Sequence, residues 1–412
     1  MASKKLLIIG FVWPEPKSSA AGSRMMQLIE AFKAGSYEIT FASACVQTKQ
    51  AFDLDSIGVS PIRITLNDSS FDLFVKTLNP DVVLFDRFMT EEQFGWRVAE
   101  QCPKALRILD TEDLHALRKG RQQALKDNYE FDRAYLFNNT AKREIASIYR
   151  SDLSLIISEI EMNLLKTEFK IDPDLLCYLP FMLETIKGAW INALPKFNER
   201  QDFISIGNFL HDPNYDAILF LKESIWPLIR KELPQAEMHV YGAYLSQKVK
   251  QLHNEKERFL IKGFTNDANH VMQRARVCLA PLRFGAGLKG KLIDAMQNGT
   301  PSVMTSIAAE GMFGKLKANG FIEDNSSMLA AKAIQLYTDE ILWNEKQQFG
   351  FETINKRFSN VKYRHKVLQD VNKAIREIDI RRQHNFIGQL LQYQTLQSTK
   401  FMSKWIEEKN KN

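Results

Sequence analysis

The stretch that decides the fold is residues 283–301, which read RFGAGLKGKLIDAMQNGTP. Gly285, Gly287 and Gly290 form a turn in which backbone amides can approach a ligand closely. The turn leads directly into an expected helix at 292–298. Because a helix N-terminus has free N–H groups and a positive dipole end, it attracts phosphate groups. The stretch therefore predicts a phosphate-binding turn that follows a buried strand.

Charged side chains in the same stretch extend this prediction to a nucleotide. Arg283, Lys289 and Lys291 place positive charge beside the turn. Asp294 follows Lys291 by three residues, and a carboxylate there can accept two hydrogen bonds from a ribose diol. A glycine-rich turn without a ligand is the alternative interpretation. The coincidence of glycines, cations, helix and carboxylate favours the nucleotide.

Short, wholly apolar runs separated by helical patterns extend outward on both sides of this stretch. Expected strands occur at 6–11, 37–43, 79–86, 106–110, 153–158, 202–208, 237–242, 259–263, 277–281 and 301–305. Strands that are apolar throughout indicate parallel sheets covered on both faces. The series restarts after a weakly patterned stretch, so we predict an α/β protein with two Rossmann-like doubly wound domains facing across a cleft.

The pattern also sets the expected domain boundaries. We expect an N-terminal domain at 1–183, a linker at 184–201 and a second domain, which contains the predicted phosphate turn, at 202–340. A basic, helical C-terminal segment at 341–412 follows. A helix at 215–232 is expected to be interrupted by Pro227.

Composition and cysteine usage favour a globular protein of the cytoplasm. The chain has 412 residues, of which 45% are hydrophobic and 25% charged, which is typical of globular proteins. No run approaches the roughly 20 apolar residues that span a bilayer. The first 16 residues resemble a signal peptide only superficially, because Pro14 ends the apolar run early. The four cysteines are far apart and are expected to be reduced core residues rather than disulfides or metal ligands.

The C-terminal tail carries the net charge of +6. Residues 361–412 contain eleven Lys or Arg and five Asp or Glu, a difference of +6, so the rest of the chain is near neutral. A solvated helix face, a membrane surface and a nucleic acid are the three interpretations, and the first is preferred. The aromatic residues of the tail are expected to pack it back onto the domains: Tyr363, Phe386, Tyr393, Phe401 and Trp405.

The segment GLKGKLIDAMQNGTPSVMTSIAAEGM resembles the donor-binding segment of GT-B glycosyltransferases, particularly family 4. The run 294–303 is similar to that family's E-A-M-A-x-G-x-P-V-V helix, with Asp for Glu. A second match is 206–217, which resembles the first strand, loop and helix of the family's C-terminal domain. Residues 226–229, 261–264 and 16–24 fit the same pattern, so the resemblance spans about residues 4–340.

The resemblance implies that the domain at 1–183 is the acceptor side and that the domain at 202–340 binds the nucleotide-sugar donor. Asp294 would bind the donor ribose, and Gly287, Leu288 and Lys289 would contact the diphosphate. The remaining implied contacts are Gly263 and Phe264 beside the nucleobase and Gly22, which would approach the diphosphate from the first loop. The co-substrate is expected to be a UDP- or GDP-sugar, without a cofactor.

Two positions depart from the family pattern. Ala286 stands where the family usually has a carboxylate that faces the donor sugar. Asn208, with His211 nearby, stands where an Arg and a Lys often neutralise the leaving diphosphate, a task that Arg283, Lys289 and Lys291 could take over. The transferred sugar and the family's usual retention of anomeric configuration therefore stay open.

A second polar cluster follows the expected strand at 106–110. Asp113 and His115 resemble the family's Asp-x-His, in which His lies near the donor sugar, and both are the catalytic candidates. A His can relay a proton or bind a sugar hydroxyl, and a neighbouring Asp can fix its tautomer. A surface turn whose polar residues cap a helix is the alternative. The acceptor-side candidates are Arg24, Asp86, Arg87 and Arg118.

For three of these positions a structural interpretation is equally open. A surface arginine explains Arg24 as well as an acceptor or phosphate contact does, and an ion pair explains Asp86 and Arg87. Two further segments have weaker support. Residues 158–161 (Ser-Glu-Ile-Glu) could close the acceptor side or lie at a hinge, and Glu310 with Gly311 could reach the donor sugar or sit at a helix N-terminus.

Together these features predict a glycosyltransferase that moves a sugar from a nucleotide-diphosphate sugar to an acceptor hydroxyl. No DxD-like metal motif occurs in a suitable loop, so no metal is expected. A glycan or lipid-linked acceptor in cell-envelope or surface glycan synthesis is preferred, with possible peripheral contact at the inner face of the membrane. A modified tRNA nucleoside as acceptor and a non-catalytic nucleotide-sugar-binding scaffold are the alternatives. A dinucleotide-dependent oxidoreductase is weaker, because no G-x-G-x-x-G follows the first expected strand.

Overall fold

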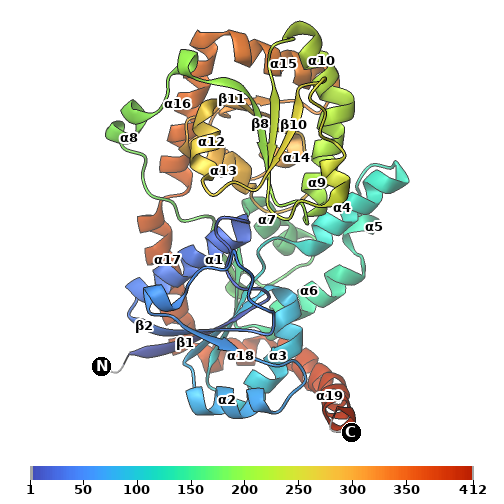
Figure 1. The fold of residues 1–412 in the computed structure, drawn as a ribbon. Coiled ribbons are helices and arrows are strands. Elements are labelled where there is room, and N and C mark those ends of the chain that lie inside the picture. The colour runs from blue at the N-terminus through green and yellow to red at the C-terminus, as the bar shows by residue number, and fades with distance from the viewer. Residues whose placement is uncertain (1–2, 411–412) are drawn as a thin grey trace.

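Two parallel β-sheets with helices on both faces organise the chain (Figure 1). The computed structural model describes residues 3–410, without the side chains of residues 395 and 396. The two sheets lie one above the other in Figure 1, and the last helices return to the lower one. We call the first sheet with its helices the N-terminal unit and the second the C-terminal unit.

The first sheet is seven-stranded and parallel, in the order β3-β2-β1-β4-β5-β6-β7. Its strands are β1 (Lys4–Gly10), β2 (Tyr37–Ser43), β3 (Ser60–Arg63), β4 (Val82–Asp86), β5 (Leu106–Asp110), β6 (Leu153–Ile156) and β7 (Leu176–Tyr178). Its first helices are α1 (Ala20–Ala34), α2 (Ser70–Leu78), α3 (Arg87–Gln101), α4 (His115–Asp127), α5 (Arg133–Leu136), α6 (Asn139–Arg150) and α7 (Glu159–Thr167), with 3₁₀ turns η1 (Asp55–Ile57) and η2 (Pro173–Leu175). The central strand β1 is buried on both faces because Leu6 and Ile8 enter one apolar cluster and Leu7 and Ile9 the other.

The second sheet is six-stranded and parallel, in the order β10-β9-β8-β11-β12-β13. Its strands are β8 (Gln201–Ile206), β9 (Met238–Tyr241), β10 (Phe259–Gly263), β11 (Ala275–Ala280), β12 (Ser302–Met304) and β13 (Gly320–Ile322). Its helices are α8 (Gly188–Ala193), η3 (Phe197–Glu199), α9 (Asp212–Phe220), the π turn η4 (Leu221–Ile225), α10 (Trp226–Glu232), α11 (Gln247–Lys250), α12 (Ala268–Arg274), α13 (Gly290–Gln297), α14 (Ser306–Ala309), α15 (Ser326–Thr338) and α16 (Glu340–Arg357). Two Rossmann-like sheets with a helical C-terminus confirm the predicted fold class.

The last three helices lead back to the N-terminal unit. They are α17 (Asn360–Arg376), α18 (Ile378–His384) and α19 (Phe386–Lys409). Four buried side chains of α17 complete one apolar cluster of the first sheet: Tyr363, Val367, Val371 and Ala374. The chain therefore passes between the units twice. At the crossing, Leu183 donates its N–H to the Phe358 carbonyl (2.7 Å) and accepts from the Asn360 N–H (2.9 Å).

Within residues 3–410 no helix combines the length and the apolar character that crossing a membrane requires. The four cysteines are free thiols, three buried and Cys45 partly buried.

Candidate active site between the two sheets

The predicted phosphate turn lies where the two units touch. An ideal Cβ built on Gly290 would lie 2.6 Å from the Cβ of Ala20, so the first residues of α13 and α1 are in contact. Lys289 is the N-cap of α13 and makes no side-chain capping hydrogen bond. Because two positive helix ends meet here, this point of the interface favours an anion.

Three ionisable side chains surround the N-terminus of α13. Lys289 donates to the carbonyl oxygens of Ala286 (3.0 Å) and Gly287 (2.6 Å). Lys291 is partly buried and makes no hydrogen bond or ion pair within residues 3–410. Burial lowers the pKa of both lysines to about 8 and raises the pKa of the partly buried Asp294 to about 7. The predicted cations and carboxylate are therefore brought together.

The amide of Gly287, predicted to contact the diphosphate, has a protein partner. Gly287 has a φ of +64° and donates its N–H to Oε1 of Glu161 (2.7 Å). Glu161 is 1% exposed and also accepts from the Leu114 N–H (3.0 Å). Burial, helped by the charge of Asp113, raises the pKa of Glu161 to about 8. Glu161 thus holds the turn against the N-terminal unit, and its carboxyl lies where the sequence predicts a phosphate oxygen.

Arg283 lies away from this group. Its Nε donates to Oδ2 of Asp216 (2.9 Å), and its guanidinium lies 5.2 Å from the ring centroid of Phe220. Asp216 is on α9, so the expected contribution of Arg283 to the phosphate site is not supported by its position. The side chain of Leu288 is buried in the apolar cluster below α13.

Two predicted donor residues lie at the carboxyl ends of β8 and β10. Gly263 has a φ of +76° and turns the chain out of β10, which leaves Phe264 38% exposed. Asn208 follows β8, and its Oδ1 accepts from the Leu210 N–H (2.9 Å). Phe264 is therefore accessible to a planar base, whereas Asn208 orders its own loop.

Gly22 has a structural role that differs from the prediction. A Cβ on Gly22 would lie 2.4 Å from the carbonyl oxygen of Glu15, so the first loop folds directly onto the first turn of α1. From the N-terminal unit, Ala20 approaches the phosphate turn at Gly290 and Asp113 approaches it at Gly287. The first loop does reach the C-terminal unit at Glu15, which accepts hydrogen bonds from the Tyr244 hydroxyl (2.6 and 2.8 Å).

His115 lies at the start of α4 in a defined tautomer. Its Nδ1 is 3.1 Å from the Asp113 carbonyl oxygen, 3.2 Å from Asp113 Oδ1 and 3.4 Å from Glu144 Oε1. Because these neighbours are all acceptors, the proton belongs on Nδ1, and Nε2 is the basic nitrogen. Glu144 also accepts from the backbone amides of His115 (2.9 Å) and Ala116 (3.0 Å). The helix-capping role is thus filled by Glu144, and Asp113 and His115 contact each other as predicted.

Asp113 connects His115 to the C-terminal unit. Burial opposes its ionisation, but Arg118, whose Nε is 2.9 Å away, and His115 hold the pKa of Asp113 below its usual range. Arg118 also lies 3.1 Å from Nε2 of His211. Burial, together with Arg118, lowers the pKa of His211 to about 4. Arg118 was predicted to contact the acceptor; here it joins the two units.

Arg24 is neither a surface residue nor accessible to an acceptor. It is 1% exposed, and its Nη2 lies 2.8 Å from Oδ1 of Asp110. Its Nη1 donates to the Leu179 carbonyl (2.7 Å). The guanidinium fixes the ends of β5 and β7 from inside the unit, which corrects its predicted role.

The ends of β4 and β5 carry backbone strain. Arg87 and Glu112 have φ values of +70° and +61°, which are unfavourable for residues with side chains. Asp86 and Arg87 form an ion pair (3.6 Å), and Asp86 accepts from the Phe11 N–H (3.0 Å). Burial, then Asp110 and Asp86, raises the pKa of Glu112 well above its usual range. Such strain commonly marks functional loops.

The sequence prediction missed one strong link between the units. Arg121 forms two hydrogen bonds with the Glu310 carboxylate (2.7 and 2.8 Å) and donates to the Gly285 carbonyl (2.8 Å). Arg121 follows Arg118 by about one helical turn, so its position on the same face of α4 could have indicated that it also lies at the interface. The contact of Glu144 with His115, 29 residues away in the sequence, had no such signal.

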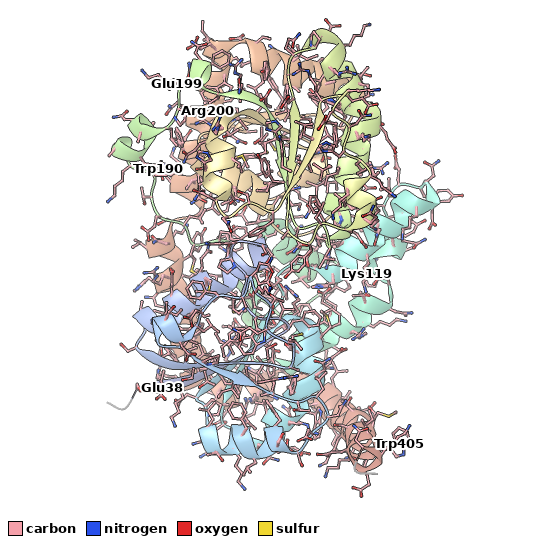
Figure 2. All side chains as sticks on the ribbon, viewed as in Figure 1. Glu38, Lys119, Trp190, Glu199, Arg200 and Trp405 are labelled. Atoms are coloured by element: carbon pink, nitrogen blue, oxygen red, sulfur yellow. The ribbon has the colours of Figure 1, made fainter. Side chains whose placement is uncertain are left out.

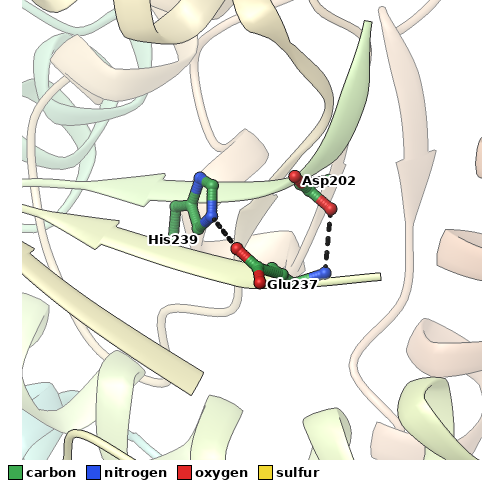
Figure 3. Close-up of side chains that lie close together, drawn as sticks. All are labelled: Asp202, Glu237 and His239. Carbon is green, nitrogen blue, oxygen red and sulfur yellow. Dashed lines mark hydrogen bonds and ion pairs between the residues drawn. The ribbon is translucent and has the colours of Figure 1, made fainter. Parts of the chain in front are cut away.

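A separate acid–histidine cluster lies at the amino ends of two internal strands of the second sheet (Figure 3). Possible ligand atoms of Asp202, Glu237 and His239 lie within 4.8 Å of one another. Oε2 of Glu237 is within hydrogen-bond distance of Nε2 of His239 (2.8 Å), and Asp202 accepts from the Glu237 N–H (2.9 Å). These groups satisfy one another at the amino ends of β8 and β9, away from the phosphate turn.

Comparison with known proteins agrees with this geometry. Residues 200–339 match the family described as "Glycosyl transferases group 1". This match includes the phosphate turn, α13 and Asp294. A curated relative, the "Uncharacterized 44.6 kDa protein in cps region" of Klebsiella pneumoniae, is 25% identical over 165 residues, which are 38% of this chain and 42% of the relative. The alignment thus spans less than half of that relative.

Solved structures match over most of the chain. Sucrose-phosphate synthase from Thermosynechococcus elongatus has a TM-score of 0.68 at 14% identity, covering 90% of this chain and 98% of its own. Anabaena Alr3699/HepE in complex with UDP and glucose has a TM-score of 0.65 at 14% identity (90% and 99%). WaaG, described as a glycosyltransferase involved in lipopolysaccharide biosynthesis, has a TM-score of 0.59 at 11% identity (88% and 98%). The fold is therefore that of the GT-B glycosyltransferases.

Proposed function

We infer that this chain, a GT-B glycosyltransferase with a group 1 domain, moves a sugar from a nucleotide-diphosphate sugar to an acceptor hydroxyl. One observation carries the proposal. The N-terminus of α13 combines a glycine turn, the buried Lys289, the partly buried Lys291 and the partly buried carboxylate of Asp294 within six residues, 289 to 294. That group lies inside the matched family region and against the N-terminus of α1.

We propose that the donor diphosphate lies at the N-terminus of α13. Lys291, which has no partner within the described residues, would approach the diphosphate, and Lys289 would add its charge from below the turn. Asp294, one turn further along the same helix, would accept from the ribose diol. Phe264 would border the base. A UDP-sugar is the preferred donor, because the similar HepE structure holds UDP and glucose, and a GDP-sugar is the alternative.

The protein's catalytic tasks would be to neutralise the leaving diphosphate and to orient the acceptor. The two helix N-termini and the lysines would serve the first task. His115 would serve the second, since its Nε2 can accept a hydrogen bond from a sugar hydroxyl while Asp113 and Glu144 hold Nδ1–H. We propose a metal-independent reaction with retention, as in the family 4 enzymes that the sequence resembles.

We propose an acceptor in cell-envelope or surface glycan synthesis and a cytoplasmic location. The role printed for WaaG supports this acceptor class. The free thiols are consistent with a reducing compartment. A tRNA acceptor is the alternative, because the tail is basic. Such binding would weaken steeply with added salt.

The test is a thermal-shift panel of UDP-, GDP-, ADP- and dTDP-sugars on the wild type, Asp294→Ala and Lys291→Ala. A ligand that binds only the folded protein raises its Tm with occupancy. We expect one nucleotide class to stabilise the wild type and neither variant. Ile341→Ser, a change at an 85% exposed residue of α16, is the matched control and should respond like the wild type. No stabilisation of the wild type by any donor would contradict the proposal.

A further inference from the structure

Helix α19 packs on the N-terminal unit through its polar side. Ser403 accepts from Nη2 of the buried Arg97 (2.9 Å), and Glu407 lies 3.9 Å from the same guanidinium. Gln392 donates to the Arg150 carbonyl (2.9 Å). Gly388 is buried, and a Cβ there would lie 2.2 Å from the Tyr149 carbonyl oxygen. The described contacts of α19 with the N-terminal unit are therefore made by small and polar residues.

The outer side of the same helix is apolar. Seven side chains between 49% and 69% exposed form what we call the apolar face: Phe386, Ile387, Leu390, Tyr393, Phe401, Met402 and Trp405. They form two groups along the helix, 386–393 and 401–405, on the side away from Ser403, with exposed polar residues such as Gln394 and Gln397 between the groups. Figure 2 shows Trp405 on the projecting helix, at the outside of the molecule.

This arrangement inverts the usual order of a surface helix. An amphipathic helix of a globular protein normally buries its apolar stripe and exposes its polar one. The expectation that the tail aromatics pack back onto the domains is correct for Tyr363, which is 5% exposed. It is wrong for Phe386, Tyr393, Phe401 and Trp405. Since exposing several large apolar side chains on one helix is costly in water, α19 is suited to an apolar environment.

We propose that α19 docks in the interfacial layer of a membrane that contains anionic lipid, with the apolar face buried at the boundary between headgroups and acyl chains. Trp, Tyr and Phe are the side chains favoured at that depth. Lys404 is exposed and makes no hydrogen bond or ion pair within residues 3–410, and Lys409 lies over the ring of Trp405 (5.2 Å). Within α19 three lysines stand against two glutamates, and Lys400 donates to Glu100, so Lys404 and Lys409 are the cations of this helix that complement anionic headgroups.

Charge and residue type favour a lipid surface over other occupants. A second copy of this chain, paired through a two-fold axis, would bring the same basic segment against itself. A nucleic acid would need cations along the strip, whereas the apolar face has seven apolar side chains and two flanking lysines. A bilayer interface needs only an apolar stripe with cations beside it.

The test is co-sedimentation of the full chain with vesicles of phosphatidylcholine alone and of phosphatidylcholine with 30% phosphatidylglycerol. Neutral vesicles report apolar binding alone, and a content of about 30% anionic lipid adds electrostatic binding. We expect sedimentation with the anionic vesicles that weakens as salt rises. The double variant Phe401→Ser/Trp405→Ser should lower the partition coefficient at least about tenfold. Lys404→Glu should lower it on anionic vesicles only.

Leu73→Ser is the matched control, because Leu73 is 70% exposed on α2 of the same unit, and it should bind vesicles as the wild type does. Equal sedimentation of the double variant and the wild type would overturn the proposal, as would absence of binding to either vesicle. A dimer in light scattering that the same double variant abolishes, without vesicle binding, would instead assign the apolar face to a second copy. The inference is independent of sugar transfer, since vesicle binding requires no donor and the thermal-shift panel requires no vesicle.

Discussion

Glu161 is a carboxyl group enclosed between the two units with one oxygen satisfied and one not. Oε1 accepts from the amides of Leu114 and Gly287, while the buried Oε2 has no hydrogen-bond partner within residues 3–410. Since burial raises the pKa from 4.5 to about 8, the folded protein holds this proton more tightly than the unfolded chain. The stabilisation is full below pH 4.5 and is lost as pH rises through about 8.

The variant Glu161→Gln isolates this effect, because the amide keeps an acceptor oxygen and cannot ionise. We expect the free energy of unfolding of the wild type to fall relative to that of the variant as pH rises from 4.5 to 8. Urea unfolding at intervals of pH measures this difference. A difference that is constant over the same range would contradict protonation at Glu161.

Donor affinity should pass through a maximum between about pH 7 and pH 8. Asp294, with a pKa of about 7, must be ionised to accept fully from the ribose diol. Lys289 and Lys291, with pKa values of about 8, must be protonated to attract the diphosphate. Affinity should fall by up to about tenfold per pH unit beyond either limit. Titration calorimetry with the stabilising donor measures the profile.

Two substitutions separate the limbs of this profile. Asp294→Asn should weaken binding and flatten the acid limb. Lys291→Arg keeps its charge above pH 10, so only Lys289 still titrates and the alkaline limb should become less steep. A profile that neither variant changes would remove both residues from the donor site.

At the scale of residues, the sequence predicts groupings of side chains that are close together in the chain and misses contacts between residues far apart in it. Lys289, Lys291 and Asp294 lie within six residues on one turn and helix, so their proximity could be predicted. The contacts Glu161–Gly287 and Arg121–Glu310 join residues 126 and 189 positions apart, and only the packed units bring them together.

At the scale of elements, the meeting of α1 and α13 depends on a missing side chain. A Cβ on Gly290 would be 2.6 Å from Ala20 Cβ, closer than real side chains come. Gly290→Ala should therefore push the two helix ends apart and weaken donor binding by about tenfold, equivalent to about 1.4 kcal/mol. Donor titration by thermal shift measures the loss.

The double variant Ala20→Gly/Gly290→Ala moves the methyl group to the other helix and should restore most of the affinity. Gly188→Ala is the control, because a Cβ there meets nothing within 4 Å. Failure of the double variant to recover binding would mean that Gly290 acts through its own backbone rather than through the contact.

The predicted elements succeed where burial makes the pattern strong. Central strands such as β1 and β4 are apolar throughout and were expected near their observed limits. The edge strands β3, β7 and β13 have only three or four residues and gave no distinct pattern. The interruption expected at Pro227 lies just before it, as the π turn Leu221–Ile225, because a Pro in the first turn of α10 needs no amide partner.

At the scale of the whole molecule, α17 is part of the N-terminal core although it follows the C-terminal unit in sequence. We expect a chain ending at residue 359 to aggregate, because Val367, Val371 and Ala374 would leave an apolar face of the first sheet uncovered. A chain ending at residue 385 keeps α17 and should stay soluble. Soluble yield and thermal unfolding measure both, and a cooperative transition in the shorter chain would contradict the assignment.

The contacts between the units also set the conditions for donor binding. Arg121–Glu310, Arg118–His211 and Glu15–Tyr244 hold the carboxyl ends of the two sheets together. In the proposed reaction a phosphate oxygen would replace Glu161 at the Gly287 amide. The units would therefore have to separate and close again in each catalytic cycle.

The return of α17 also reverses the order in which the two units can mature on the ribosome. The C-terminal unit is continuous, from Gly188 to Arg357, and can form its core as soon as that stretch has emerged. The N-terminal unit is translated first but must wait for the last 53 residues, 360–412, of which α17 is the first element. The half that is translated first is therefore the last to finish folding, and its exposed sheet face is the natural target of chaperones during synthesis.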